Sequence, residues 1–381
     1  MMKNILQNAF RNLLKWMGEF YPKNKKSILI GIPNASFYND NSKYFFEFLT
    51  KKNLPDFEIY LLTKNKKLYS SLKDKFGKHL VYAFSIKALM AYFRSKFVLI
   101  SNGNDDIFPF LPSTKKQIVI NMWHGNPIKK IGYLNTKPGE KINLNLNYFL
   151  VSSKTERDTI IRAFKNTLHK EQFKIFGIPR NDIFFNQKDK RQRTDKKVKI
   201  LYLPTFRETS SVEFFPFEDF DKKGLYDFLS KNNLEIIIKP HKKDSTNQRL
   251  LNILKENPNV KLKTSENNDL DIQQMLLDCD ILLTDYSSVY FDFLLLDRPI
   301  IYLPYDFEEY KNARGFLYDD FEEIICGDKV FTQKDFIESI QNNLENPAKD
   351  ELRRKAITER FHQHNDGLAS ERLFNFIKNH S

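Results

Sequence analysis

The stretch Asp280-Ile-Leu-Leu-Thr-Asp-Tyr-Ser-Ser-Val-Tyr-Phe-Asp292 indicates how this chain folds. An apolar, strand-like run ends in the turn at residues 284–288, and an amphipathic segment follows at once. A helix that begins directly after a strand directs its free backbone N–H groups and the positive end of its dipole toward an anion. The stretch therefore predicts a phosphate-binding turn in an α/β fold. A simple helix cap by Asp285 or Ser287 is an alternative that the turn alone leaves open.

The length and composition predict two domains and an anionic partner. A chain of 381 residues exceeds the size at which single cores usually stop growing, and 41% of its residues are hydrophobic. Lys and Arg outnumber Asp and Glu by 61 to 48, which gives a net charge of +13. Nucleic acid, anionic lipid and phosphorylated molecules all fit that charge. No helix-turn-helix, zinc-finger or RNA-binding signature accompanies it, so we do not expect nucleic acid as a partner.

The cysteines and the hydropathy pattern indicate the compartment. Cys279 and Cys326 lack metal-ligand spacing and cannot form a disulfide framework, as is typical of a reducing cytoplasm. The chain contains no run of about 18 apolar residues, and its N-terminus lacks the features of a secretory signal. The sequence therefore predicts a cytoplasmic protein that does not cross a membrane.

Residues 1–26 have the pattern of a basic amphipathic helix. Two interpretations stay open, because the amphipathic pattern is the same in both: the helix packs on the first domain, or it attaches the protein peripherally to the inner face of a membrane. The apolar positions are Ile5, Leu6, Phe10, Leu13, Leu14, Met17 and Phe20, and the basic positions are Lys3, Arg11, Lys15, Lys23, Lys25 and Lys26.

Short aliphatic runs then alternate with longer amphipathic stretches, which predicts a parallel, doubly wound sheet. We expect a first Rossmann-like domain over residues 27–186. The charged stretch 186–197 has no periodic apolar face and is interpreted as the interdomain linker. The strands expected in this half are 27–32, 57–63, 97–101, 117–122, 148–152 and 173–176, with helices at 42–52 and 85–93.

The same alternation resumes in a second Rossmann-like domain, expected over residues 198–360. The tail is helical in pattern from residue 333 to 380, with breaks at Asn346-Pro347 and Asp366-Gly367. We expect its last helix, in residues 361–381, to pack back on the first domain. The strands expected in this half are 198–203, 234–239, 260–262, 281–284 and 299–303, and the helical stretches include 224–232, 248–256 and 272–277.

Four polar clusters follow directly on predicted strands. Ligands of open α/β sheets bind outside the carboxyl ends of the strands, so we expect these clusters to face a cleft between the domains. They are Trp123-His124-Gly125, Pro204-Thr205-Phe206-Arg207, His241-Lys242-Lys243 and Thr284 to Ser288.

The types of these residues favour acid–base and phosphoryl chemistry. His124 lies beside Gly125, which permits close approach of a ligand, and a neutral imidazole accepts a proton from an attacking hydroxyl. A histidine that only satisfies a nearby carbonyl is the alternative. Arg207, Lys239 and His241 are donors suited to phosphoryl oxygens, although a solvated surface cation remains the alternative for each.

Other chemistries lack their signatures. The chain has no Gly-x-x-x-x-Gly-Lys-Ser/Thr loop, no Gly-x-Gly-x-x-Gly after a strand, no His-Glu-x-x-His helix and no Gly-x-Ser-x-Gly elbow. The acidic pairs Asp105-Asp106 and Asp319-Asp320 come without further ligands at a recognisable spacing. We expect no dedicated metal site and no bound cofactor.

Six ordered segments, spread over most of residues 121–316, form a pattern that no single motif provides. They are Asn121-Met-Trp-His-Gly-Asn-Pro-Ile-Lys-Lys-Ile-Gly132, Gly177-Ile-Pro-Arg-Asn-Asp182, Ile200-Leu-Tyr-Leu-Pro-Thr-Phe-Arg207, Ile238-Lys-Pro-His241, Leu283-Thr-Asp-Tyr-Ser-Ser-Val-Tyr-Phe-Asp292 and Arg314-Gly-Phe316. In these segments the chain resembles the CDP-glycerol glycerophosphotransferase family, which comprises teichoic-acid primases and polymerases and related capsule polymerases. Before Asn121 it is similar only weakly, through Phe37-Tyr-Asn-Asp-Asn-Ser-Lys43.

The resemblance implies a GT-B fold, in which two Rossmann-like domains face each other across a cleft. It also implies transfer of glycerol phosphate from CDP-glycerol to a hydroxyl of a lipid-linked or polymeric acceptor, with release of CMP. His124 and His241 would be catalytic, with His124 as the base. The donor diphosphate would be bound by Arg207, His241, Thr284, Ser287 and Ser288, with Asp285 mainly shaping the turn, and the supporting residues would be Gly125, Arg180, Asn181, Asp182 and Lys239.

The resemblance leaves the substrates partly open. Asn126 stands where Thr is common in the family, and Pro240 precedes His241 where a proline often follows. These departures leave the acceptor undetermined. CDP-ribitol as donor, and a nucleotide-sugar glycosyltransferase of the same fold, remain alternatives. The short chain fits a primase as well as a polymerase.

Overall fold

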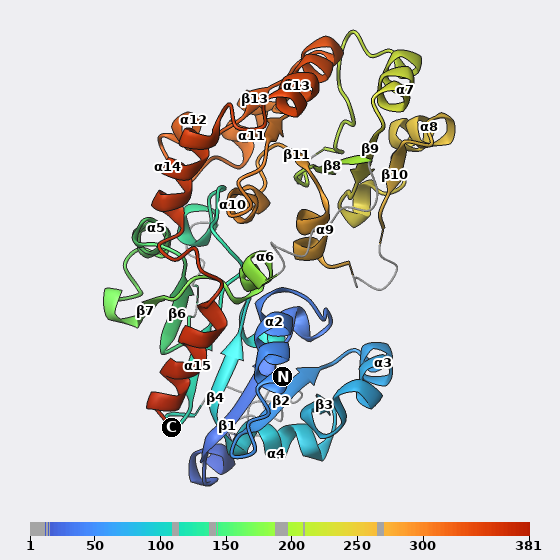
Figure 1. The fold of residues 1–381 in the computed structure, drawn as a ribbon. Helices are drawn as coiled ribbons and strands as arrows, with labels where there is room; N and C mark the ends of the chain where they lie inside the picture. Colours follow the sequence, from blue (N-terminus) through green and yellow to red (C-terminus); the bar gives the residue numbers. More distant parts are fainter. Residues whose placement is uncertain are drawn as a thin grey trace, which may run out of the picture.

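The computed structural model shows two α/β domains that follow one another along the long axis of the molecule, each built on its own sheet (Figure 1). It describes residues 12, 14, 16–108, 114–136, 142, 144–186, 197–208, 210–264 and 270–381. The expected linker at 186–197 lies outside these residues except for its two ends.

The first sheet has the strand order β3-β2-β1-β4-β5-β6-β7, and neighbouring strands are parallel. The order changes direction between β1 and β4, and ligands of doubly wound sheets bind at such a point. The strands are β1 (Asn24–Gly31), β2 (Glu58–Thr63), β3 (Leu80–Tyr82), β4 (Ser95–Ile100), β5 (Ile118–Asn121), β6 (Tyr148–Val151) and β7 (Phe173–Ile175).

The second sheet has the order β10-β9-β8-β11-β12-β13 and is also parallel. Its direction changes between β8 and β11, so the loops that carry Arg207 and the 284–288 turn lie side by side at the equivalent point. The strands are β8 (Val198–Leu203), β9 (Leu234–Ile238), β10 (Val260–Leu262), β11 (Ile281–Thr284), β12 (Ile300–Tyr302) and β13 (Asp328–Lys329).

Every strand expected from the sequence has a counterpart, and two further strands were missed. The missed strands are β3 and β13, which form one edge of each sheet and contain three and two residues. Strands this short offer too few positions for an aliphatic run to stand out from its surroundings.

Helices bury both faces of each sheet, as parallel sheets require. In β1, Ile28 and Ile30 pack against α2, α3 and α15, whereas Leu29 packs against α4 on the other face. In β8, Ile200 packs with α7, α8 and α13, whereas Leu201 packs with α9 and α10. The helices are α2 (Asp40–Lys51), α3 (Lys66–Phe76), α4 (Ile86–Arg94), α5 (Lys154–Ala163), α6 (Asp182–Asn186), α7 (Lys222–Lys231), α8 (Gln248–Glu256), α9 (Ile272–Asp278), α10 (Val289–Leu294), α11 (Phe307–Ala313), α12 (Phe321–Ile324), α13 (Gln333–Glu345), α14 (Glu351–Phe361) and α15 (Ala369–Asn379).

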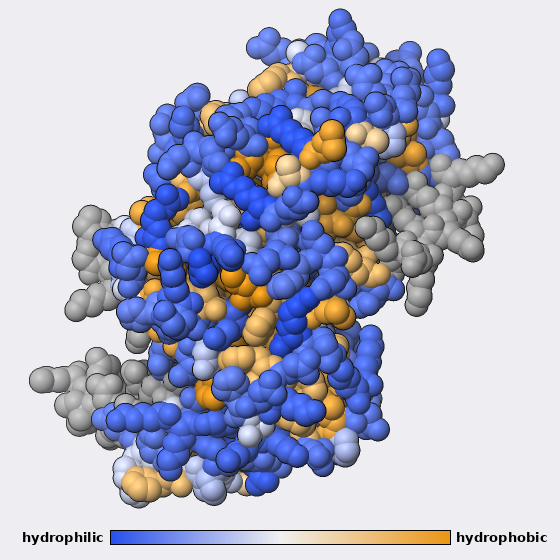
Figure 2. Space-filling view, turned by 60° about the vertical axis from the view of Figure 1, so that its left-hand side comes forward, coloured by the Kyte–Doolittle hydropathy of each residue, from blue (hydrophilic) through white to orange (hydrophobic). Residues whose placement is uncertain are grey.

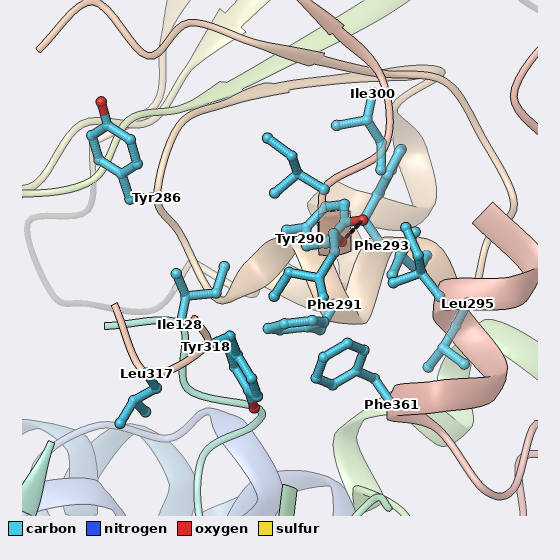
Figure 3. Close-up of a cluster of buried hydrophobic side chains, with 14 of the residues drawn as sticks. Ile128, Tyr286, Tyr290, Phe291, Phe293, Leu295, Ile300, Leu317, Tyr318 and Phe361 are labelled. Atoms are coloured by element: carbon cyan, nitrogen blue, oxygen red, sulfur yellow. Dashed lines mark hydrogen bonds between the residues drawn. The ribbon is translucent and has the colours of Figure 1, made fainter. Parts of the chain in front are cut away.

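An apolar cluster joins the two domains. Ile128, from the loop after β5, lies among side chains of the second domain that include Phe291 and Leu317 (Figure 3). Phe361 of α14 completes the contact, with its ring centroid 4.4 Å from that of Phe291 and 5.3 Å from that of Tyr318. This shared core fixes how the two sheet edges face each other.

The end of the chain returns to the first domain. Leu373, Phe374 and Ile377 of α15 are buried in the same cluster as side chains of α2. Figure 1 shows α15 alongside the first domain. Asp182 binds the start of α15, because its carboxylate oxygens accept hydrogen bonds from the backbone N–H groups of Ala369 (2.9 Å) and Ser370 (2.8 Å).

The N-terminal segment only partly follows the expected amphipathic helix. Residues 1–11, 13 and 15 lie outside the described residues, residues 16–20 are helical, and β1 begins at Asn24, so the helix ends before Lys25 and Lys26. Leu14 is buried against α4, whereas Trp16 and Phe20 are 61% and 69% exposed. Figure 2 shows a pale apolar patch at the lower end of the first domain, level with this helix in Figure 1. Within the described residues, no helix combines the length and hydropathy needed to cross a bilayer.

Candidate functional site

His124 lies on the loop that follows β5. The side chain of Asn121, at the end of that strand, accepts a hydrogen bond from the backbone N–H of Trp123 (2.8 Å). Trp123 has a left-handed φ of +57°, and Gly125 follows with φ +104°, which turns the chain sharply at His124. The indole of Trp123 is buried, and the imidazole of His124 lies over it, exposed, with ring centroids 3.9 Å apart. The loop thus presents an accessible imidazole on a rigid base.

The surroundings of His124 favour its neutral form. The pKa of His124 is lowered, first because the protein around it limits hydration of the imidazolium, and further because Arg180 and Lys129 lie near. Asp40 and a hydrogen bond to the carbonyl of Ser101 act in the opposite direction. His124 is accessible to solvent but closely surrounded by protein atoms, so its exposure and its lowered pKa are compatible. A neutral imidazole at pH 7 is the form that a general base requires.

The next residue with a polar side chain, Asn126, points away from the open side of the loop. It is buried, and its amide donates to the hydroxyl of Ser152 (2.9 Å). The backbone N–H of Ser152 in turn donates to the carboxylate of Glu156 (2.6 Å). Burial raises the pKa of Glu156 to about 7. Asn126 therefore helps to fix the His124 loop to the first domain.

The 284–288 turn of the second domain divides into a buried part and an accessible part. Thr284 and Asp285 are buried: the hydroxyl of Thr284 donates to the carbonyl of Leu203 (2.9 Å), and Asp285 accepts from the backbone N–H of Thr205 (2.9 Å). Ser287 is half-buried, and the hydrogen bond that its hydroxyl accepts from Val289 N is long (3.4 Å). Ser288, also half-buried, precedes α10 without a side-chain cap. The two serine hydroxyls are thus the accessible polar groups of the turn.

Arg207 lies beneath this turn, and its placement differs from the direct donor contact expected from the sequence. Its side chain is 4% exposed, and its guanidinium donates to Asp285 (3.0 Å) and to both carboxylate oxygens of Asp306 (2.6 and 2.8 Å). The rings of Tyr286 and Tyr310 lie about it, with centroids 5.1 and 5.0 Å from its central carbon. Thr284, Asp285 and Arg207 therefore shape the turn from inside, because their polar atoms already pair with protein groups.

His241 is exposed on the neighbouring loop, after β9. The His241 ring lies against that of Phe206, with centroids 4.5 Å apart. The ammonium of Lys243 lies 4.8 Å from the centroid of the same Phe206 ring. The pKa of His241 is lowered, first by partial burial, with Lys239 and Lys243 adding to the effect and Asp244 opposing it. Lys239 is half-buried, and burial lowers its pKa as well.

Lys129 connects the two facing edges. Lys129 belongs to the loop that carries His124, and it lies beside Phe206 and Arg207 of the second domain, of which Phe206 contacts the ring of His241. The charge of Lys129 also contributes to the lowered pKa of both histidines, after larger effects in each case. A short bridge holds the loop in place: the backbone N–H of Lys130 donates to Gly315 O (3.1 Å), and that of Leu317 donates to Ile128 O (2.8 Å). Beside this bridge is a cavity of about 70 Å³, lined by residues of both domains that include Lys129, Phe206, Arg207, Glu208, Ser210, Asp306, Tyr310 and Arg314.

Arg180 forms an interdomain ion-pair cluster with Asp40 and Asp292. Arg180 lies in a short turn (Pro179–Asn181) of the first domain, and its guanidinium donates to Asp40 at the start of α2 (2.6 Å) and to Asp292 of α10 (2.6 and 3.1 Å). Asn181 donates to the other oxygen of Asp292 (2.8 Å). A Cβ atom on Gly125 would lie 2.5 Å from a nitrogen of Arg180, so only glycine fits there. The cluster thus ties the 284–288 turn, through α10, to the His124 loop.

The other expected site residues fall into two groups. His124, Gly125, Arg180 and Asn181 come together at the domain junction. His241, Ser287 and Ser288 follow strands β9 and β11 at one edge of the second sheet, with β8 between them. Asp182 stands apart, because it binds the start of α15 instead of lining this junction. In the part of the chain that the structure describes, no three His, Cys, Asp or Glu side chains are grouped as metal ligands.

Sequence reasoning did not single out Asp40, Asp292 or Asp306. Asp306 follows β12 by a few residues, so the rule that located the other clusters at strand ends applied to it as well. Asp40 lies within the weakly similar segment 37–43, and Asp292 ends the stretch that predicted the fold. None of the three has a neighbour in the sequence that reveals an arginine partner.

Comparison with known proteins connects this geometry to one family. A sequence model of the CDP-glycerol:poly(glycerophosphate) glycerophosphotransferase family matches residues 13–379. A teichoic acid glycerol-phosphate transferase of Staphylococcus aureus is 26% identical, over 97% of this chain and 97% of that protein. A teichoic acid poly(glycerol phosphate) polymerase of Bacillus spizizenii is 29% identical over 84% of each chain. A teichoic acid poly(ribitol-phosphate) polymerase of that species is 29% identical, over 87% of this chain and 52% of its own length.

The fold has a close counterpart among solved structures. The structure of the wall teichoic acid polymerase TagF superposes with a TM-score of 0.78 at 22% identity, covering 99% of this chain and 95% of that chain. This likeness, together with the two parallel sheets, confirms the expected GT-B fold of two Rossmann-like domains.

Proposed function

The chain belongs to the CDP-glycerol:poly(glycerophosphate) glycerophosphotransferase family, and we propose that it transfers glycerol phosphate from CDP-glycerol to an acceptor hydroxyl, releasing CMP. The observation that best supports the location of this chemistry is the bridge between the domains, which sets Lys129 of the His124 loop beside Phe206 and Arg207 of the second domain, while Phe206 contacts His241. Two accessible histidines on facing sheet edges are the arrangement that a reaction between an acceptor and a nucleotide donor needs.

We assign His124 as the general base. The acceptor oxygen attacks the phosphorus attached to glycerol, and its proton passes to the neutral imidazole. A new P–O bond forms to the acceptor, the P–O bond to the CMP phosphate breaks, and CMP departs with the bonding electron pair. The lowered pKa of His124 supports this role, because the base must be unprotonated before attack.

We assign the donor diphosphate to the facing edge of the second domain. Ser287 and Ser288 offer accessible hydroxyls in front of α10, and His241 and Lys239 supply donors for the charge that develops on the leaving phosphate. Arg207 and Asp285 act indirectly, because their mutual pairing and that with Asp306 hold the turn in shape. His241 is the catalytic residue on this side, where it stabilises the departing CMP.

A donor panel tests the proposal. Purified protein is incubated with CDP-glycerol, CDP-ribitol, UDP-sugar or GDP-sugar and a lipid-linked or oligomeric acceptor, and nucleotide release is measured. Release of CMP from CDP-glycerol that depends on acceptor supports the proposal. Turnover of CDP-ribitol alone would change the donor, since ribitol-phosphate polymerases are among the relatives. Turnover of a sugar nucleotide alone would contradict the reaction class.

We further propose that the acceptor is an anionic, lipid-linked or polymeric chain that the enzyme meets at the inner membrane surface. Trp16, Met17 and Phe20 are exposed together at the end of the first domain, beside basic residues, as in a helix that lies in a membrane interface. Trp16→Ala/Phe20→Ala is expected to lose co-sedimentation with anionic vesicles. Leu352→Ala removes an even more exposed apolar side chain (86%) from α14 and serves as the control. Unchanged vesicle binding of the double variant would refute the attachment.

The proposed reaction uses no cofactor held by the protein and no nucleic acid. Transfer is therefore expected to continue after the protein has been passed over a chelating column and returned to metal-free buffer with donor and acceptor. Loss of activity that returns with one divalent metal would show that a metal takes part.

A further inference from the structure

Two residues with strained backbones meet beside His124. Asp40, the first residue of α2, has φ +58°, and Trp123 has φ +57°. Left-handed backbone is uncommon outside glycine, and such residues are concentrated at functional sites. Asn41 holds the two segments together, because its amide donates to the carbonyl oxygens of Met122 (3.1 Å) and Trp123 (2.8 Å).

The side chain of Asn41 also holds the turn that carries Arg180. The side-chain oxygen of Asn41 accepts a hydrogen bond from the backbone N–H of Arg180 (3.0 Å). The guanidinium of Arg180 then donates to Asp40 (2.6 Å), and the backbone N–H of Asn41 donates to the same Asp40 oxygen (2.8 Å). The Asp40 carboxylate is thus held in one orientation beside the His124 loop.

The charges of the interdomain ion-pair cluster leave an excess of one negative charge near His124. Two carboxylates, Asp40 and Asp292, surround the single guanidinium of Arg180. Of the charged groups that face His124, Asp40 favours its protonated form, whereas Arg180 and Lys129 oppose it. Asp292 also pairs with Arg180, at the same distance of 2.6 Å as Asp40, so the guanidinium does not cancel the charge of both carboxylates.

We propose that Asp40 is the positioning residue and charge partner of the base His124, steadying the imidazolium that forms when the acceptor hydroxyl is deprotonated. The inference depends on the proposed function for its chemistry. During attack the acceptor O–H bond breaks and an N–H bond forms on His124, while the new P–O bond replaces that to CMP. The positive charge that appears on the ring then lies beside a fixed carboxylate. Because Arg180 is held by Asp292 of the second domain, this partner is complete only when both domains are joined.

Asp40→Asn separates charge from structure. Asparagine tolerates left-handed backbone as aspartate does, and its oxygen still accepts from Arg180 and from the backbone of residue 41. Asp271→Asn is the matched control. The Asp271 carboxylate also contacts α2 at the domain junction, where it accepts hydrogen bonds from Lys43 (2.6 Å) and Tyr44 (2.8 Å). Asp271→Asn also removes one negative charge at α2, but Asp271 is not among the charged groups that act on His124.

The measurement is the titration of His124 in the whole protein, followed by NMR of labelled histidine and assigned by the signal lost in His124→Gln. The midpoint of His124 is expected to fall by about 0.5 pH unit or more in Asp40→Asn and to stay unchanged in Asp271→Asn. In the transfer assay the acidic limb of kcat/KM moves in the same direction, kcat falls about 10- to 100-fold, and KM for CDP-glycerol changes less than about 2-fold. Asp40→Gly, which also suits left-handed backbone, is expected to give the same shift.

A His124 midpoint that is unchanged in both Asp40 variants would overturn the proposal, even if transfer were lost. So would an equal shift in Asp271→Asn. The titration needs no substrate, so it still decides the Asp40–His124 pairing if the wild-type protein turns over no CDP-linked donor. That second result would contradict the proposed function alone.

Discussion

The interdomain ion pair between Arg180 and Asp292 is expected to carry a large part of the stability of the domain junction. The side chains are 9% and 2% exposed, and four hydrogen bonds converge on the Asp292 carboxylate, from two nitrogens of Arg180, from Asn181 and from Gln273. Asp292→Asn keeps the shape of the side chain but removes its charge and turns an NH₂ group toward donors. The substitution leaves Arg180 buried with one carboxylate in place of two.

The size of the effect follows from this geometry. Removing one member of a buried ion pair costs about 3–5 kcal/mol, because the other charge stays buried. Asp40 remains 2.6 Å from Arg180 and is itself 18% exposed, so the lower end applies and we expect a loss of about 3 kcal/mol. That loss is a decrease of roughly 100-fold in the ratio of folded to unfolded protein.

Urea unfolding followed by tryptophan fluorescence measures this loss at the junction. The chain has two tryptophans, of which Trp123 is 7% exposed and lies in the apolar cluster that joins the domains, while Trp16 is already 61% exposed. The emission change on unfolding therefore reports mainly on the junction. Asp56→Asn is the control, because it breaks an ion pair with Lys26 whose side chains are 74% and 48% exposed, at a cost of at most about 1 kcal/mol.

A midpoint for Asp292→Asn that moves no further than that of Asp56→Asn would contradict this expectation. The Arg180–Asp292 pair would then contribute as little as an exposed one, and the apolar cluster alone would hold the domains together.

Three further outcomes are expected. His124→Ala lowers kcat at least about 100-fold while calorimetry shows unchanged CDP-glycerol binding, because the base acts only on the acceptor; full activity would contradict this role. Ser287→Ala/Ser288→Ala weakens CDP-glycerol binding about 10-fold or more, through loss of hydrogen bonds to a charged group, whereas Ser71→Ala on the exposed face of α3 has no effect. Burial raises the pKa of Glu156 from its usual 4.5 to about 7, so folding takes up a proton between these values and the wild type loses stability as pH rises through that range. Glu156→Gln is therefore expected to gain up to about 3 kcal/mol over the wild type at pH 8 and little at pH 4.5 by urea unfolding, and an equal effect at both pH values would disprove the shift.

Much of the fold was predictable because its signals are local. The aliphatic runs located all described strands except the two short edge strands β3 and β13, and the polar clusters that follow strands contain His124, His241, Ser287 and Ser288, which are exposed or half-buried. The basic amphipathic pattern was less reliable, since it extended the N-terminal helix over Lys25 and Lys26, which belong to β1. Periodicity does not mark where a polar helix end passes into a strand.

The amino-acid sequence was sufficient to predict two parallel α/β domains, the turns that end their strands and the residue types that serve phosphoryl transfer. Which of those residues are accessible became clear only from the folded chain. Folding brings Arg207 to Asp306, 99 residues away, and buries it, while Ser287 and Ser288 are only half-buried. Arg180 likewise meets Asp292 across 112 residues and Asp40 across 140. A buried charge must find an opposite charge, and the sequence, which specifies local backbone preferences, does not reveal at such separations which one it will be.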